Sequence, residues 1–421
     1  MLFRSTGYYR KSADREGYRL IQEKSPSVPN MDSAFTIEQT NVITLDGLPV
    51  VDRAPEFLGA DGERERDARV LNLEETLALA VQHSRNYQSR KAQLYLSALA
   101  LALARHQFAP IFSGSGNANY SVQTEQAVTV GIDEITGQPK VLVSDSLVEQ
   151  SRVGASGTIN ASWLLRDVGR ITTAFTADFL RFVTGDPRVT TSSQLSATFL
   201  RPMLRDAGFK QQTEALIQAE RQLLYDLREF TQFRKDFSVQ IATAYYGVLG
   251  NRDTVRNNFL NLQSSRRNAE RTRALAQEGR VTQADLGRLE QQELSAESAW
   301  INAIRGYRQA LDNFKLQLGL NTDANIVLAD GELEALQIRH PEISVENSIQ
   351  VALAARLDYM NTKDQFEDAE RRVDLAANLL KPRVDLTASV AISSDPNDNT
   401  GFPVPDYDRY RWNAGLNLDP G

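Results

Sequence analysis

Apolar residues recur along the chain with two different periods, and the change from one to the other marks where elements begin and end. From Leu73 to Pro110 they return every three or four residues, which is the spacing of an amphipathic helix. After Pro110 the spacing falls to two, which is typical of a strand whose two faces meet different surroundings. The sequence therefore predicts a long helix that ends at a proline and leads into strands.

Four alternating segments lie between Phe112 and Phe199, and the alternation returns after Pro382. Their apolar positions carry large side chains, among them Phe112, Tyr120, Ile159, Trp163, Phe175, Phe199, Val390 and Trp412. The positions between are almost all Ser, Thr, Asn or Gln, whereas the outer face of a soluble β-sandwich normally carries Lys and Glu. Because small uncharged groups suit a water-filled lumen and large apolar groups suit lipid, this pattern favours a transmembrane β-barrel.

Helical spacing returns at about Gln211 and continues to about Glu278, and a second helical segment runs from Leu286 to Gly319. Both segments are far longer than an average globular helix. The break between them, residues 279–282, is so short that the two helices must form an antiparallel hairpin. Apolar residues of the second helix form a heptad-like seam, and Gly319 suits its C-terminal cap.

The first helix and the start of the strands occur twice in the chain. Residues 73–110 align with residues 345–382 without gaps at an offset of 272, and eight of the 38 aligned positions are identical. The change from helical to alternating spacing falls at the same place in both copies, at Pro110 and Pro382. We interpret this self-similarity as an internal duplication.

The pattern predicts three consecutive parts. They are an extended N-terminal arm over residues 1–70, a first repeat over 71–340 and an incomplete second repeat over 341–421. The first repeat should hold a helix, strands over 111–201, the helical hairpin over 209–319 and a connector; the second should hold a helix over 343–380 and strands over 383–393 and 409–418. Because the second repeat has no hairpin of its own, we expect the sequence to be truncated at its C-terminus.

Composition and motifs argue against several classes of protein. The 47 Lys and Arg against 54 Asp and Glu give a net charge of -7, so nucleic acid is not an expected partner. There is no cysteine for disulfide or thiolate chemistry. The histidines His83, His106 and His340 lie far apart, and no nucleotide-binding or hydrolase motif is present. We therefore predict no catalytic, cofactor or metal site, and no enzyme.

Three local sequences carry a resemblance to a known family. Residues 201–208, Arg-Pro-Met-Leu-Arg-Asp-Ala-Gly, are similar to that family's strand-to-helix junction, a Pro-Leu-Leu run followed by Gly. The hairpin tip supplies its Gly, Thr and Asp as Gly279, Thr282 and Asp285, and residues 316–320 resemble its helix end. In this order, inside a duplicated frame over residues 73–421, these motifs resemble the TolC-like outer membrane efflux proteins.

The resemblance implies a mixed α and β fold in which long antiparallel helical hairpins, forming a periplasmic α-barrel, join the strands of a transmembrane β-barrel. Such a fold is internally duplicated and complete only as a homotrimer. It implies a channel in the outer membrane, in contact with outer-membrane lipid and extending into the periplasm of a Gram-negative-type cell. The channel would carry small molecules or proteins outward from a periplasmic adaptor (membrane fusion) protein and, indirectly, an inner-membrane pump; drug efflux and type I secretion stay alternatives.

The number of strands departs from the family pattern. The first repeat holds four strand candidates where the family usually has two. Either the barrel is larger, or the segment from Ile171 to Phe199 forms an extracellular flap.

The resemblance also suggests two sets of site residues. The exposed hairpin tip, with Gly279, Arg280, Thr282 and Asp285, would dock into the adaptor, although a tight turn favours Gly in any case and Thr282 would also serve as a helix cap. The second set, Trp163 and Trp412, consists of candidates for the aromatic girdle at the membrane interface, although ordinary strand packing also accounts for them.

A soluble coiled-coil scaffold that binds partners is the alternative function. It accounts for the long helices but not for the uncharged polar positions of the strands, nor for the duplication of a unit that contains helix and strands. A simple diffusion porin is disfavoured because porins consist almost wholly of strands.

Overall fold

The computed structural model describes residues 5–32, 34–38, 43–132, 139–184, 189–335, 337, 342–395 and 403–420. The chain forms two compact units, each built from separated stretches of sequence. The helical unit comprises Met1–Leu99 and Gln222–Lys363, and the sheet unit comprises Ala100–Arg221 and Asp364–Gly421. Each unit therefore combines residues from both repeats, and the division into three consecutive parts stays a prediction.

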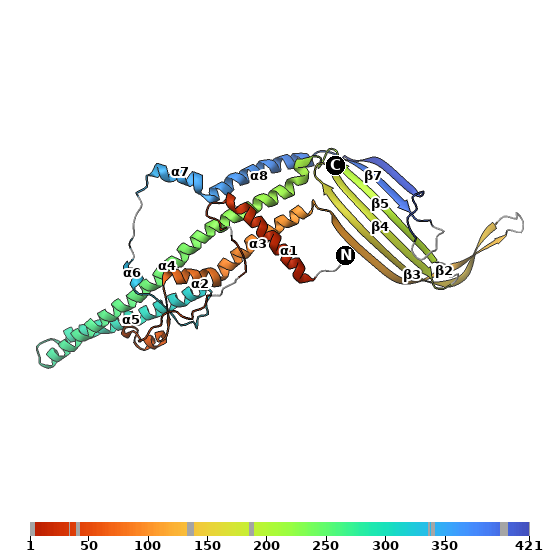
Figure 1. The fold of residues 1–421 in the computed structure, drawn as a ribbon. Coiled ribbons are helices and arrows are strands. Elements are labelled where there is room, and N and C mark those ends of the chain that lie inside the picture. Colours follow the sequence, from red (N-terminus) through yellow and green to blue (C-terminus); the bar gives the residue numbers. More distant parts are fainter. Residues whose placement is uncertain are drawn as a thin grey trace. The chain divides into compact units, whose positions relative to one another are not determined.

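The helical unit consists mainly of long helices (Figure 1). Its elements are α1 (Thr6–Lys24), η1 (Ser25–Ser27), η2 (Glu56–Glu65), β1 (Arg69–Leu71), α2 (Leu73–His83), the first part of α3 (Arg85–His106), most of α4 (Phe209–Gln277), α5 (Gln283–Leu318), β6 (Ile326–Leu328), α6 (Gly331–Ala335), α7 (Val345–Ala355) and the first part of α8 (Leu357–Leu379). Among the helices that the structure describes, none is both long and apolar enough to cross a membrane.

The sheet unit contains one antiparallel sheet of six strands, joined to the remaining parts of α3, α4 and α8. The strands are β2 (Ile111–Ile132), β3 (Pro139–Leu165), β4 (Gly169–Phe182), β5 (Val189–Pro202), β7 (Arg383–Ser393) and β8 (Tyr410–Asp419). Their order across the sheet is β2-β3-β4-β5-β7-β8. The strands β4 and β5 of the Ile171 to Phe199 segment lie inside the sheet between β3 and β7, as a larger barrel requires.

The internal duplication is visible in the bounds of the elements. The helices α2 and α7 each have 11 residues, and each follows a capping side chain, Asn72 in the first and Ser344 in the second. Each helix ends at a residue with extended backbone angles, Ser84 and Arg356, before the next helix begins. Both pairs are separated by the offset of 272 found in the sequence, as are the first residues of β2 and β7.

The predicted continuous helix of each repeat is wrong at these two interruptions. At Ser84 the side-chain amide of Gln88 donates hydrogen bonds to the backbone oxygens of Val81 (2.8 Å) and Gln82 (3.0 Å). These bonds satisfy carbonyl groups that the end of α2 leaves without helical partners. The interruption at Arg356 similarly divides the segment predicted over 343–380. Apolar periodicity continues across both breaks and therefore does not reveal them.

The predicted extended arm over residues 1–70 is also wrong, because α1 forms within it. This helix buries Gly17, Leu20 and Ile21. Its fit against α3 is close: a Cβ atom at Gly17 would lie 3.1 Å from the ring of Tyr95, whose hydroxyl donates a 2.5 Å hydrogen bond to Asp14. Further along the same interval, β1 pairs in parallel with β6. The few apolar residues of α1 are enough to hold the helix in place because they pack closely against α3.

The predicted hairpin of α4 and α5 is present, and its contacts follow a heptad rhythm. The Phe259 and Trp300 rings lie 5.8 Å apart. Arg266, seven residues after Phe259, pairs at 3.5 Å with Glu293, seven residues before Trp300. A constant antiparallel register therefore runs along the two helices. At the end of α5, Gly319 adopts φ 80° in the left-handed region, as its predicted role as a cap requires.

Candidate channel and docking surfaces

The six-stranded sheet has one apolar face, because neighbouring strands place their apolar positions opposite one another. One row of the register contains Ile159, Phe175, Leu195, Ile392 and Tyr410, from five successive strands. The large side chains on this apolar face are Phe112, Tyr120, Ile159, Trp163, Ile171, Phe175, Phe179, Leu195, Phe199, Val390, Ile392, Tyr410, Trp412 and Leu416. The sheet therefore carries a continuous apolar layer across β2 to β8.

The opposite face of the sheet is polar and mostly uncharged. One row across it contains Ser162, Thr172, Thr198, Ser389 and Asn413. The hydroxyls of Thr158 and Thr176 lie 3.3 Å apart on the same face. Such groups interact with water without imposing a strong charge, as the lining of an aqueous lumen does.

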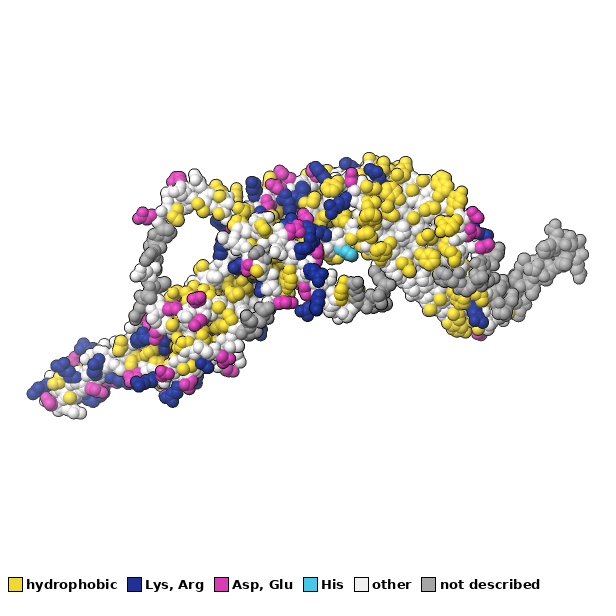
Figure 2. Space-filling model, in the orientation of Figure 1, with side chains coloured by type: hydrophobic (Ala, Val, Ile, Leu, Met, Phe, Trp, Pro, Cys, Tyr) yellow, Lys and Arg dark blue, Asp and Glu magenta, His cyan; other side chains and the backbone are white. Residues whose placement is uncertain are grey.

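Within the sheet unit, Figure 1 shows no described helix lying over either face of the sheet. In Figure 2, hydrophobic side chains gather over the strands, whereas charged side chains are concentrated over the helices. Large residues of the apolar face are exposed, including Ile159 at 63% and Trp412 at 69%. An apolar layer of this extent is unfavourable in water and needs an apolar covering.

The two tryptophans predicted to lie at a membrane interface share the apolar face. Trp163 stands opposite Ile171, and Trp412 stands opposite Val390. Their rows are adjacent in the register of the sheet. The Trp163 indole donates a 3.1 Å hydrogen bond to the backbone oxygen of Phe108. Membrane contact by these residues stays a prediction.

The tip between α4 and α5 holds its four candidate docking residues together. Gly279 has φ 75°, and the backbone N–H of Arg280 donates to the carbonyl of Leu275 at 2.9 Å. The Thr282 hydroxyl accepts the N–H of Asp285 (3.2 Å) and donates to its carboxylate (2.7 Å). Thr282 therefore caps α5, and Gly279 allows the turn. Docking at this tip is not tested by these contacts.

Solved structures with the same arrangement of elements are similar to this chain. CusC, studied for transmembrane channel formation, matches with a TM-score of 0.51 at 12% identity, over 83% of this chain and 65% of its own. The outer membrane protein VceC from Vibrio cholerae matches with a TM-score of 0.51 at 15% identity, over 82% of this chain and 67% of its own. The outer-membrane channel OprN matches with a TM-score of 0.50 at 12% identity, over 91% of this chain and 72% of its own. No family model and no curated protein matches the sequence.

The chain has the outer-membrane channel fold. The prediction of this fold from the duplicated frame and the junction motifs is therefore confirmed, as is the mixed α and β class. At these identities the likeness is one of fold. The chain spans about two thirds of the length of the solved structures that it matches.

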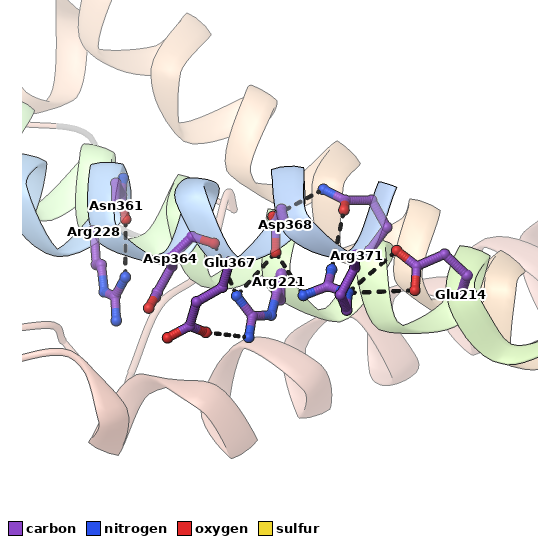
Figure 3. Close-up of polar contacts among 9 residues, drawn as sticks. Glu214, Arg221, Arg228, Asn361, Asp364, Glu367, Asp368 and Arg371 are labelled. Atoms are coloured by element: carbon purple, nitrogen blue, oxygen red, sulfur yellow. Dashed lines mark hydrogen bonds and ion pairs between the residues drawn. The ribbon is translucent and has the colours of Figure 1, made fainter. Parts of the chain in front are cut away.

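Within this channel fold, a cluster of charged residues fastens α8 to α4 inside the sheet unit (Figure 3). Asp368 on α8 has a side chain only 3% exposed and pairs with Arg221 on α4 (2.9 Å) and Arg371 on its own helix (2.8 Å). Arg221 also pairs with the more exposed Glu367, and Arg371 with Glu214. Since β5 leads into α4 and α8 leads into β7, this cluster fixes the two helices beside a pair of bonded strands.

A second buried cluster fastens the 56–65 segment to the α4 and α5 helices of the channel fold. The Glu65 carboxylate accepts hydrogen bonds from Arg252 (2.8 Å) and from the Tyr307 hydroxyl (2.7 Å). Burial and the neighbouring Glu65 charge raise the pKa of Tyr307 well above its usual range, so the hydroxyl remains a donor. Arg252 also pairs with Asp330.

Sequence reasoning named neither cluster. Asp368 and Arg371 are three residues apart, as are many exposed helical pairs, and Glu214 and Arg221 are two turns apart on α4. Nothing in such spacing distinguishes a buried pair from a solvated one. The weak signal available was that both helices carry acidic and basic residues next to predicted strands.

Proposed function

We propose that the chain is a subunit of a homotrimeric efflux channel of the outer membrane. The sheets of three copies close one β-barrel in the membrane, and the long helices form an α-barrel in the periplasm. The fold match supports this, since OprN is described as an outer-membrane channel and CusC is described by transmembrane channel formation.

The observation that carries the proposal is the two-faced sheet. It carries a continuous apolar layer on one side and mostly uncharged polar side chains on the other, and no described helix of the sheet unit lies over either face. Lipid outside and water inside is the one pair of surroundings that suits both faces. The soluble scaffold offers no covering for the apolar face.

The proposed channel is a passive conduit and not an enzyme. Small molecules or proteins reach it from a periplasmic adaptor, and an inner-membrane pump supplies the energy. The mostly uncharged polar face of the sheet supports this role, because most of its side chains offer a solute hydrogen bonds without a net charge.

Outer-membrane assembly tests the proposal directly. The chain, exported behind a cleavable signal peptide, should enter the outer-membrane fraction as a trimer that resists SDS and dissociates on heating. A monomeric product that stays in the soluble fraction would contradict the channel and favour the coiled-coil scaffold.

Tryptophan fluorescence tests which residues meet lipid. The chain has three tryptophans, so substituting two of them by Phe leaves one reporter. In vesicles of brominated lipid, variants that retain Trp163 or Trp412 should be quenched, because both lie on the apolar face. The Trp300 variant is the control, because its indole lies in the helical unit and bonds to the backbone oxygen of Phe57. Quenching of Trp300 alone would rule out the assignment.

A bulky residue at the tip tests adaptor docking. Gly279→Trp should abolish efflux or secretion while trimers persist, because the tip is exposed and its contact surface would change shape. Asn257→Trp, at an exposed position of α4 well before the tip, is the matched control and should leave transport intact. If the Gly279 variant still transports, docking does not occur through this tip.

A further inference from the structure

The hairpin formed by β4 and β5 has no counterpart in the described second repeat. With the offset of 272, β2 corresponds to β7, since Ile111 and Arg383 start these strands. The strand paired with each of them corresponds as well, since β8 lies opposite β7 as residues 153–162 of β3 lie opposite the start of β2. Each repeat thus contains this pair of strands, and in the first repeat β4 and β5 follow the pair.

This added hairpin is a full part of the sheet. β4 pairs with β3 over 14 residue positions and with β5 over 12, and β5 continues into nine pairs with β7. Phe175 and Leu195 point to the apolar face, and Thr172 and Thr198 belong to the polar face, as their neighbours in the same rows do. The hairpin therefore meets the same two surroundings as the strands on either side of it.

In the part of the chain that the structure describes, β2 and β8 are the two edges of the sheet. Every residue of β8 is exposed, whereas β4 in the middle of the sheet is mostly half-buried. Residues 111–124 of β2 contain no charged residue and no proline, and β8 contains no proline and two charged residues, Arg411 and Asp419. Soluble proteins usually protect strand edges with charges, prolines or bulges, so residues 111–124 of β2 and the uncharged residues 412–418 of β8 are suited to pairing with further strands.

The number of strands decides how copies can pair. With six antiparallel strands, β2 and β8 run in opposite directions. The β8 edge of one copy therefore meets the β2 edge of the next copy as an antiparallel pair, and a ring of copies closes without a parallel contact. The occupant that fits each open edge is a second copy of this chain.

We propose that three copies form a barrel of eighteen strands, in which the β4–β5 hairpin of each copy widens the pore. This inference rests on the proposed trimeric channel. With strands about 4.8 Å apart and tilted by about 40°, eighteen strands give a backbone diameter of about 36 Å. A ring with only two strands per repeat, twelve in all, would measure about 24 Å. The cross-section thus increases about 2.2-fold, which favours bulky cargo such as polypeptides.

Cysteine pairs distinguish a widened barrel from a twelve-stranded barrel with a flap. The chain has no cysteine of its own, so introduced pairs are unambiguous. Thr198→Cys with Ser389→Cys joins directly opposed positions of β5 and β7. Ser162→Cys with Ser389→Cys joins β3 and β7 in the same row, three strand spacings or about 14 Å apart.

In trimers extracted from the outer membrane, oxidation should link the first pair and not the second, as judged by mass spectrometry of the cross-linked peptides. A link between Ser162→Cys and Ser389→Cys would place β3 beside β7 and overturn the wide barrel. The proposed function would still hold in that case, because the protein would still form an outer-membrane trimer. Absence of any outer-membrane trimer would instead overturn the proposed function, and the wide barrel with it.

Counting strands by electron cryomicroscopy gives an independent measurement. The trimer should show eighteen strands, and a variant lacking residues 166–199 should show twelve. The deletion joins the end of β3 to the start of α4 and keeps neighbouring strands antiparallel, since β3 and β5 run in the same direction. If that variant does not assemble, the count for the unmodified chain alone decides, and twelve strands there would overturn the proposal.

Discussion

The buried carboxylate of Asp368 provides a quantitative test of how α8 is held to α4. Replacing Asp368 with Ala removes the shared acceptor of Arg221 and Arg371 and leaves two guanidinium groups close together. Breaking a fully buried ion pair costs about 3–5 kcal/mol. Because the two arginine side chains are 28% and 26% exposed, water compensates part of this loss. We expect Asp368→Ala to lower the free energy of unfolding by about 2–4 kcal/mol.

The neighbouring Glu367 supplies the matched control. It pairs with the same Arg221 at 2.8 Å, but its side chain is 48% exposed. Glu367→Ala should therefore cost only about 0–1 kcal/mol, as exposed ion pairs do. Urea unfolding in detergent, followed by circular dichroism, measures both variants. Equal losses, or a loss under about 1 kcal/mol for Asp368→Ala, would refute the view that burial decides the strength of this cluster.

Two further predictions concern the helical unit. Gly319→Ala should lower the free energy of unfolding by about 3 kcal/mol or more, because φ is 80° and a Cβ would lie 2.0 Å from the His83 carbonyl oxygen. Gly306→Ala, in open space within α5, is the control and should instead stabilise by about 0.5–1 kcal/mol. Similar shifts of the two variants in thermal unfolding would contradict this prediction. Tyr307→Phe should cost about 1.5–3 kcal/mol at pH 7 by removing the bond to Glu65. Since the folded protein raises the Tyr307 pKa, this contribution is full below pH 10.0 and declines above it. If the stability difference between the unmodified protein and Tyr307→Phe grows at high pH, the prediction is refuted.

Periodicity predicted most of the elements because the strands and long helices meet uniform surroundings over many residues. The four segments from Phe112 to Phe199 and the hairpin ending at Gly319 appear in the structure close to their predicted positions. Each of these elements keeps one face in one environment, so its apolar residues repeat regularly.

Local contacts between distant residues were not predictable in the same way. The place of β4 and β5 inside the sheet depends on which strands pair, and a strand of either kind shows the same alternation. The burial of Asp368 depends on α8 packing against α4 at the level of Arg221. The helix α1 forms because Gly17 fits against Tyr95, a contact between residues 78 positions apart. Information of this kind lies in pairs of residues and not in a single stretch.

The constant register between α4 and α5 limits how this protein can change in length during evolution. One inserted residue in α4 would turn everything beyond it by about 100° and carry Arg266 away from Glu293. Seven residues added to both helices would turn each by only about 20° from its former position, so the contact between Phe259 and Trp300 and the ion pair between Arg266 and Glu293 would nearly keep their register. Relatives with longer or shorter hairpins should therefore differ by multiples of seven residues, balanced between the two helices.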